Sequence, residues 1–177
     1  IPTTFDELLS TGKKLKSGDV AGVAMRSKAD GSAGTWPCGG FVFSNGGVVI
    51  QDGKCMLDSP EAIEAVQYYG SILNEAGPLG VGNYHWYECL NDYMQEAVAI
   101  GLDSSNFATD IENPEKSNAA GHTTYGAMVS GPGKQAKPNM WHWMAGINSK
   151  SQQKAAAFLF LTWANSKPTC LMSSALG

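Results

Sequence analysis

Two short apolar runs constrain the fold of this chain most strongly. Residues 20–25 and 97–102 are uninterrupted runs of apolar and small residues, each bounded by polar residues or glycine. Runs this short predict strands, and the lack of polar alternation predicts that both faces of each strand are buried. A helical pattern precedes each run, so helices alternate with buried strands and the sequence predicts an α/β fold.

Local signals mark where several helices begin. Thr4 and Glu7 have the spacing of a capping box, and Ser59 followed by Pro60 is a typical helix start. The spacing of apolar residues predicts helices over residues 5–16, 36–43, 60–76, 86–94 and 151–165.

Extended segments are predicted at four places besides the two buried strands. Residues 48–51 and 54–57 flank Asp52-Gly53, a pair that favours a tight hairpin turn. Residues 123–129 and 140–147 are also predicted to be extended, on either side of a loop that contains Gly131-Pro132-Gly133.

Composition and charge exclude several classes of protein. The 177 residues are 43% apolar and 16% charged, which disfavours disorder. The net charge is -4 and the lysines are scattered, so we expect no nucleic-acid partner. The longest apolar stretch, residues 155–161, is far below the roughly 20 residues of a membrane-spanning helix.

The four cysteines, at positions 38, 55, 89 and 170, lack the paired spacing of a zinc site, so we expect no metal and no cofactor. They leave two alternatives open: up to two disulfides, or buried free thiols. The motifs of serine hydrolases, zinc proteases and nucleotide-binding enzymes are missing from the sequence. We therefore predict that the chain is not an enzyme.

The final predicted helix is apolar on nearly every side, which predicts burial all round. The chain also begins on a helix, without the strand that an α/β unit would place before it. From both features we expect an internal piece of a larger protein.

The order and spacing of several short motifs carry a family resemblance. The chain resembles the central portion of the type 1 extracellular solute-binding proteins, which are the sugar- and polyol-binding components of ABC importers, and it looks closest to the polyol-binding branch. The matching motifs lie at residues 2–8, 22–26, 52–54, 58–62, 101–104, 113–117, 141–148 and 160–164.

The resemblance implies a periplasmic-binding-protein-like type II lobe, with a mixed sheet flanked by helices and a ligand cleft between two lobes. It assigns residues 1–138 to the second, C-terminal lobe, which would be incomplete, and residues 139–177 to a crossing strand and a helix returning to the first lobe. It also implies a small-molecule sugar or polyol as ligand, an ABC permease as membrane partner, and a periplasmic or cell-surface location. Self-association of the truncated lobe is expected if its apolar surface stays uncovered.

Hydroxyl pairs of a sugar or polyol require forked hydrogen-bond partners, and the carbon face suits an aromatic ring. Arg26 follows the first buried strand and offers a rigid fork of donors, with a surface salt bridge as the alternative role. Asp103 follows the second strand, where open α/β sheets place ligands, with helix capping as the alternative. Trp36, Trp141 and Trp143 are the candidate stacking residues, although core packing is common for tryptophan.

Ser104 is a further candidate ligand contact, and Ser105 and Asn106 are minor ones. Trp86 and Trp163 are assigned to packing. Two other hypotheses remain: a carbohydrate-active enzyme fragment that uses Asp103 and Asp110 as a carboxylate pair, and a sensory or interaction module on the same fold.

Overall fold

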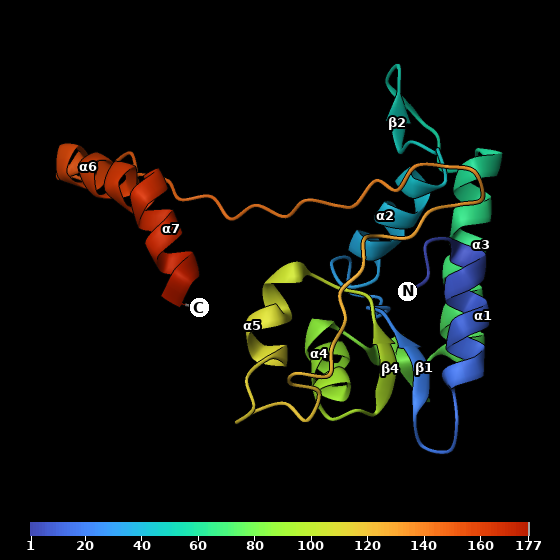
Figure 1. The fold of residues 1–177 in the computed structure, drawn as a ribbon. Helices are drawn as coiled ribbons and strands as arrows, with labels where there is room; N and C mark the ends of the chain where they lie inside the picture. The colour runs from blue at the N-terminus through green and yellow to red at the C-terminus, as the bar shows by residue number, and fades with distance from the viewer. Residues whose placement is uncertain (177) are drawn as a thin grey trace. The chain divides into compact units, whose positions relative to one another are not determined.

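The structure is a computed structural model that describes residues 1–176 (Figure 1). The chain divides into two compact units, Ile1–Asn139 and a second unit that begins at Met140. The first unit contains every strand that the structure describes, and the second contains two helices.

The first unit is organised around a parallel pair of strands, β1 (Ala21–Ala24) and β4 (Val98–Gly101). Ala21 lies opposite Val98, and Val23 lies opposite Ile100. Both strands predicted from the sequence are present, but only β1 is buried along its whole length. β4 is buried at Val98, partly buried at Ala99 and Ile100, and exposed at Gly101, so its predicted burial on both faces is only partly observed.

Helices cover both faces of this pair, which confirms the α/β class. α1 (Phe5–Leu15) and α3 (Pro60–Ala76) pack on one side of the pair, and α4 (Trp86–Met94) packs against β4 on the other (Figure 1). The predicted capping box is present, since the Thr4 hydroxyl accepts from the Glu7 N–H and the Glu7 carboxylate accepts from the Thr4 N–H. Ser59 caps α3 in the predicted way.

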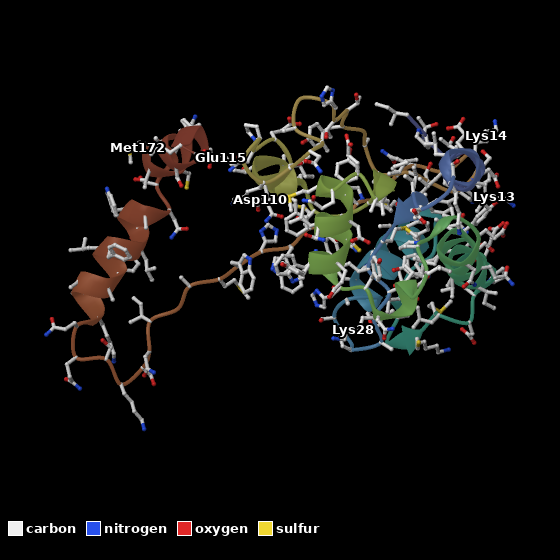
Figure 2. All side chains as sticks on the ribbon, turned by 90° about the horizontal axis from the view of Figure 1, so that it is seen from below. Lys13, Lys14, Lys28, Asp110, Glu115 and Met172 are labelled. Carbon is white, nitrogen blue, oxygen red and sulfur yellow. The ribbon has the colours of Figure 1, made fainter. Side chains whose placement is uncertain are left out.

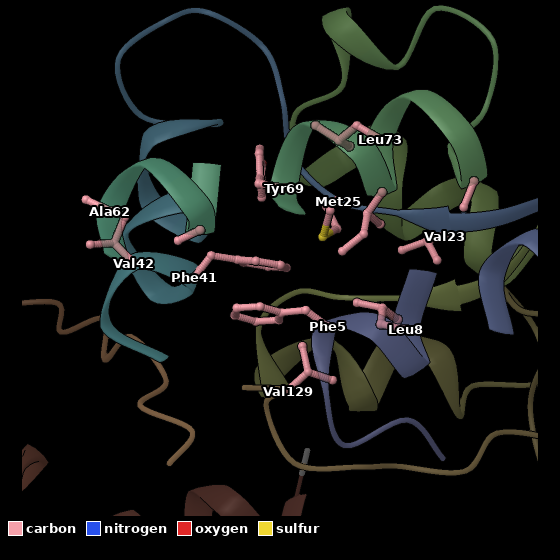
Figure 3. Packing of buried hydrophobic residues seen from close by; sticks show 13 residues of the cluster. Phe5, Leu8, Val23, Met25, Phe41, Val42, Ala62, Tyr69, Leu73 and Val129 are labelled. Carbon is pink, nitrogen blue, oxygen red and sulfur yellow. The ribbon is translucent and has the colours of Figure 1, made fainter. Parts of the chain in front are cut away.

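The main core lies between α1, α3, β1 and α2 (Thr35–Ser44) (Figure 3). The Phe5 ring stacks on the Phe41 ring at a centroid distance of 4.6 Å, and Tyr69 meets Phe41 edge-on at 5.2 Å. α1 approaches β1 through two glycines: a Cβ atom on Gly22 would lie 2.0 Å from the carbonyl oxygen of Gly12. The close contact of helix and strand therefore requires glycine at position 22.

The predicted hairpin is formed by β2 (Ile50–Gln51) and β3 (Lys54–Cys55), which pair antiparallel. Its turn residues Asp52 and Gly53 both have positive φ angles, 51° and 74°, as a tight hairpin turn requires. This hairpin forms a two-stranded sheet separate from the β1–β4 pair. Short helices complete the unit: η1 (Val81–Asn83), η2 (Ser105–Phe107) and α5 (Ala108–Ile111).

The extended run predicted over residues 123–129 forms no strand in the described part of the chain. Only its neighbour Ser130 bridges to the start of α1, where the Phe5 N–H donates to the Ser130 carbonyl at 2.9 Å. An extended backbone becomes a strand only where a neighbouring chain supplies a ladder of hydrogen bonds.

The second unit contains α6 (Lys154–Ala164) and α7 (Lys167–Leu176). α7 was not predicted, although Ser166 and Pro168 are ordinary helix-start residues. Residues 140–147 form no ladder within the described residues, so the predicted crossing segment is not a β-strand here.

The helix whose apolar character calls for burial on all sides, α6, stays exposed in this unit, as expected from the few residues available to cover it. No α6 residue is buried, and Phe158, Leu159, Phe160 and Trp163 are between 59% and 68% exposed. Among the described residues of this unit, α7 is the one helix that packs with α6, and one neighbour cannot cover a helix that is apolar all round.

All four cysteines are free thiols in the structure, and none forms a disulfide. Cys89 is buried and Cys38 is partly buried, whereas Cys55 and Cys170 are exposed. Within residues 1–176, no helix has the length and apolar character needed to cross a membrane.

Candidate functional site

The candidate site lies at the carboxyl edge of the β1–β4 pair. Arg26 follows β1 and Asp103 follows β4, and because the strands are parallel both residues lie at the same edge. Arg26 Nε donates to Asp103 Oδ2 at 2.8 Å, and Arg26 Nη2 donates to Asp103 Oδ1 at 2.5 Å. The two side chains are only 15% and 11% exposed, so this bidentate ion pair is mostly shielded from water.

Trp36 completes the cluster from the first turn of α2. The Arg26 guanidinium carbon lies 4.8 Å from the centre of the Trp36 ring, which is a cation–π contact. Arg26, Trp36 and Asp103, which the sequence predicts separately as ligand contacts, therefore lie together at one edge of the sheet.

Two hydroxyl groups hold the chain at Arg26 and at the next residue, Ser27. The Tyr69 hydroxyl donates to the Arg26 carbonyl oxygen, and the Ser27 hydroxyl donates to the Val81 carbonyl. Tyr69 is 7% exposed, and burial raises its pKa well above the usual value. Tyr69 lies in the helix predicted over residues 60–76 and was not predicted as a site residue. The signal that could have identified it is that a buried phenol needs a hydrogen-bond partner.

Asp103 also organises the start of the loop that follows it. Its Oδ1 atom accepts from the Ser104 N–H at 2.7 Å, so the carboxylate supports the local turn as well as the ion pair. Ser104 is half-buried beside it, whereas Ser105 and Asn106 are exposed in η2.

Trp141 and Trp143 belong to the second unit and are 58% and 89% exposed. Their ring centroids lie 5.8 Å apart at an interplanar angle of 71°. The two indoles are therefore neighbours, as expected for residues two apart in an extended segment.

Trp86 begins α4, which runs back toward β4, so this tryptophan lies at the carboxyl edge of the strands. It stacks on Phe107 at 5.7 Å and packs edge-on against Tyr87, yet it remains 40% exposed. Packing, the role predicted for Trp86, accounts for one face of the ring. Trp163 likewise packs on Phe160 at 5.8 Å and stays 59% exposed.

The thiols near the site have no sign of nucleophilic activation. Burial raises the pKa of Cys89 to about 12 and also raises the pKa of Cys38. A reactive cysteine needs a lowered pKa. Among the residues that the structure describes, no three His, Cys, Asp or Glu side chains gather as a metal site would require.

Two other groups of charged residues lie away from the Arg26–Asp103 pair along the chain. Figure 2 shows Lys13 and Lys14 on α1, away from Lys28 beyond β1. Asp110, the second carboxylate of the enzyme hypothesis, binds Lys116 at 2.8 Å, whereas Asp103 binds Arg26. Two surface depressions lie over α1 and α3, and neither is lined by Arg26, Trp36 or Asp103.

Comparison with known proteins identifies the fold and the family. The family model of the bacterial extracellular solute-binding proteins matches residues 2–169. An erythritol/L-threitol-binding protein of Mycolicibacterium smegmatis is 26% identical over 111 residues, which are 63% of this chain and 23% of that protein.

Solved structures agree over nearly the whole chain. An ABC transporter solute-binding protein of Agrobacterium radiobacter in complex with ribitol superposes with a TM-score of 0.85 at 27% identity, covering 96% of this chain and 43% of that one. A maltose-bound protein of T. maritima has the same fold, with a TM-score of 0.85 at 22% identity and coverage of 96% and 44%. The chain therefore spans less than half the length of these relatives.

The family match covers residues 2–169, and this range includes the parallel β1–β4 pair and the helices that flank it. The chain belongs to the bacterial extracellular solute-binding protein family.

Proposed function

We propose that the chain is part of an extracytoplasmic receptor that binds a sugar or polyol and delivers it to an ABC permease. The observation that carries this proposal is the Arg26–Asp103 ion pair with Trp36 over the guanidinium, at the carboxyl edge of the parallel strands. The relatives support the ligand class, since their names and complexes include erythritol, L-threitol, ribitol and maltose.

The geometry leaves hydrogen-bonding capacity for hydroxyl groups. The ion pair uses the Nε–H of Arg26 and one N–H of Nη2, which leaves three of the five guanidinium N–H groups for a ligand. Asp103 has accepted three hydrogen bonds, and a carboxylate offers about four lone-pair positions. Arg26 and Asp103 can therefore bind adjacent hydroxyls while they remain paired.

The remaining ligand contacts that we propose are aromatic and polar. The Trp36 ring suits the carbon face of a polyol, and Ser104 lies next to the Asp103 carboxylate. Trp141 and Trp143 present exposed indoles in the second unit and are proposed as further stacking residues.

We also propose that residues 1–138 form the second, C-terminal lobe of a two-lobe receptor. Residues 139–177 would then cross back and return a helix to the first lobe. The boundary between the two compact units, after Asn139, supports this division. The exposed apolar residues of α6 and α7 support self-association of this part of the protein when it is isolated. A monomer at high concentration in sedimentation would contradict that.

A carbohydrate-active enzyme is the competing function. Asp103 and Asp110 are each held by a different cation, Arg26 and Lys116, and share no hydrogen-bond partner. This arrangement does not favour a catalytic carboxylate pair, which requires one neutral acid. A sensory or interaction module on the same fold would bind a protein partner in place of a sugar.

Titration calorimetry of the proposed two-lobe receptor that contains this chain tests the proposal. The panel is erythritol, L-threitol, ribitol and maltose, with glycerol as a short polyol control. We expect saturable binding of at least one longer compound and no turnover of chromogenic glycosides. Glycoside hydrolysis that Asp103→Asn abolishes would support the enzyme instead.

A further inference from the structure

Helix α2, which carries Trp36, is held along its length by a distant part of the chain. At its C-terminal end the Ser44 hydroxyl accepts from the Lys137 N–H at 2.8 Å and donates to the Lys137 carbonyl at 3.3 Å. The Ser44 carbonyl also accepts from the Gly131 N–H at 3.0 Å. The segment that ends the first unit therefore packs against α2.

At the other end of α2 the same segment reaches Trp36 itself. The side-chain amide of Asn139 donates to the carbonyl oxygen of Trp36 across 103 positions of sequence. Both residues are partly buried, so this hydrogen bond is partly shielded from bulk water.

The Asn139 amide can lie against α2 because the residue there, Gly40, has no side chain. Gly40 lies one turn along α2 from Trp36 and is buried. A Cβ atom at Gly40 would lie 3.2 Å from Asn139 Nδ2 and 3.6 Å from the Met128 methyl carbon. The absence of a side chain at position 40 gives the amide room to lie against the helix.

We propose that Asn139 is a positioning residue for Trp36: its amide holds the first turn of α2 so that the indole stays over the Arg26 guanidinium. Asn139 is also the last residue of the first unit. The hydrogen bond thus ties the aromatic side of the candidate site to the point where the chain leaves that unit. The part of this inference that concerns ligand affinity rests on the proposed function.

The alternative is that Asn139 only fastens α2 to the rest of the core. Ser44 does that at the far end of the helix, with two hydrogen bonds to Lys137 and no contact with Trp36. Ser44→Ala is therefore the matched control, because it removes the two hydroxyl hydrogen bonds to Lys137, keeps the backbone bond to Gly131, and leaves the Trp36 carbonyl untouched.

The first test needs no ligand. NMR spectra of the unliganded chain report the indole N–H of Trp36, assigned with Trp36→Phe, and the Nε–H of Arg26. We expect Asn139→Ala and the near-isosteric Asn139→Asp to shift the indole resonance and speed exchange of the Arg26 Nε–H with water. Ser44→Ala should lower the unfolding midpoint and leave both signals in place. Unchanged signals in both Asn139 variants would overturn the proposal.

Should the Asn139 variants fail to fold, the wild-type chain decides the question. A through-hydrogen-bond coupling between Asn139 Nδ2 and the Trp36 carbonyl carbon, with slow exchange of the amide protons and of the Trp36 indole N–H, supports the positioning role. Fast exchange of those protons contradicts it.

The second test uses ribitol as the probe. Losing one hydrogen bond that positions a contact residue should weaken binding by about threefold to tenfold. The loss should not add to that of Trp36→Leu in the double variant, because both act through the same indole. Full additivity would contradict the inference. If the wild-type protein binds no ribitol, that result counts against the proposed ligand, and the NMR test still judges the role of Asn139.

Discussion

Arg26 and Asp103 are joined by two parallel hydrogen bonds, although 77 positions separate them in the sequence. Each follows one strand of the parallel pair, so the register of β1 and β4 brings the guanidinium and the carboxylate face to face. Because both side chains are mostly buried, each needs the other as a partner for its charge.

Arg26→Met should destabilise the chain by about 3 kcal/mol, because it leaves the mostly buried Asp103 carboxylate without its cation. Urea unfolding measures the change. The control is Lys116→Met, which removes the exposed Lys116–Asp110 pair and should leave the stability nearly unchanged, because water screens an exposed pair. Equal effects of the two substitutions would show that the Arg26–Asp103 pair behaves as an ordinary surface pair.

Gly22→Ala should destabilise the first unit by at least about 2 kcal/mol. The new methyl group would lie 2.0 Å from the Gly12 carbonyl oxygen, so α1 would have to move away from β1. Gly70→Ala, in α3 with open space around the position, should instead stabilise by about 0.5–1 kcal/mol. Thermal unfolding should therefore give a lower melting temperature for Gly22→Ala and a higher one for Gly70→Ala. A Gly22→Ala variant with wild-type stability would refute the close helix–strand contact.

Local signals explain why much of the fold could be predicted. The Thr4–Glu7 capping box and the Asp52-Gly53 turn depend on neighbouring residues, so the sequence alone specifies them. The candidate residues Arg26 and Asp103 were found by their positions after predicted strands.

What the sequence did not reveal depends on contacts between distant segments. The pairing of Arg26 with Asp103 depends on strand register, and the Tyr69 hydroxyl reaches Arg26 from another helix. Residues 123–129 look like a strand, yet they find no partner among the described residues. Such partners are properties of the folded chain, which local periodicity cannot supply.

Stability should fall as the pH rises above about 10, the ordinary pKa of tyrosine. Burial and the hydrogen bond to Asp92 raise the pKa of Tyr84 to about 12, and burial raises the pKa of Tyr69 further. The unfolded chain therefore loses these protons first, and the linked stability is full below pH 10 and is lost progressively toward pH 12. Urea unfolding of the wild-type chain and of the Tyr84→Phe variant at several alkaline pH values measures this dependence of stability on pH. The free energy of unfolding of the variant should fall less steeply with pH than that of the wild type. An equal slope for the two proteins would show that Tyr84 is not responsible.

Tyr69→Phe should destabilise the chain by about 1–2 kcal/mol, because the Arg26 carbonyl loses its hydroxyl donor in a buried setting. The ring itself stays, so its edge-on packing against Phe41 is kept. Chemical denaturation gives the loss, and ribitol titration shows whether the position of Arg26 has changed. Wild-type stability would mean that the hydroxyl contributes nothing to holding Arg26.

Calorimetric titration of ribitol into the wild-type protein and its Asp103→Asn and Trp36→Leu variants tests the central claim most directly. Asp103→Asn keeps the size of the side chain and removes the charge that pairs with Arg26, and Trp36→Leu removes the ring over the guanidinium. We predict saturable wild-type binding that each substitution weakens by about tenfold or more. Wild-type binding that both variants retain in full would show that the ligand lies elsewhere, and would contradict the assignment of this site.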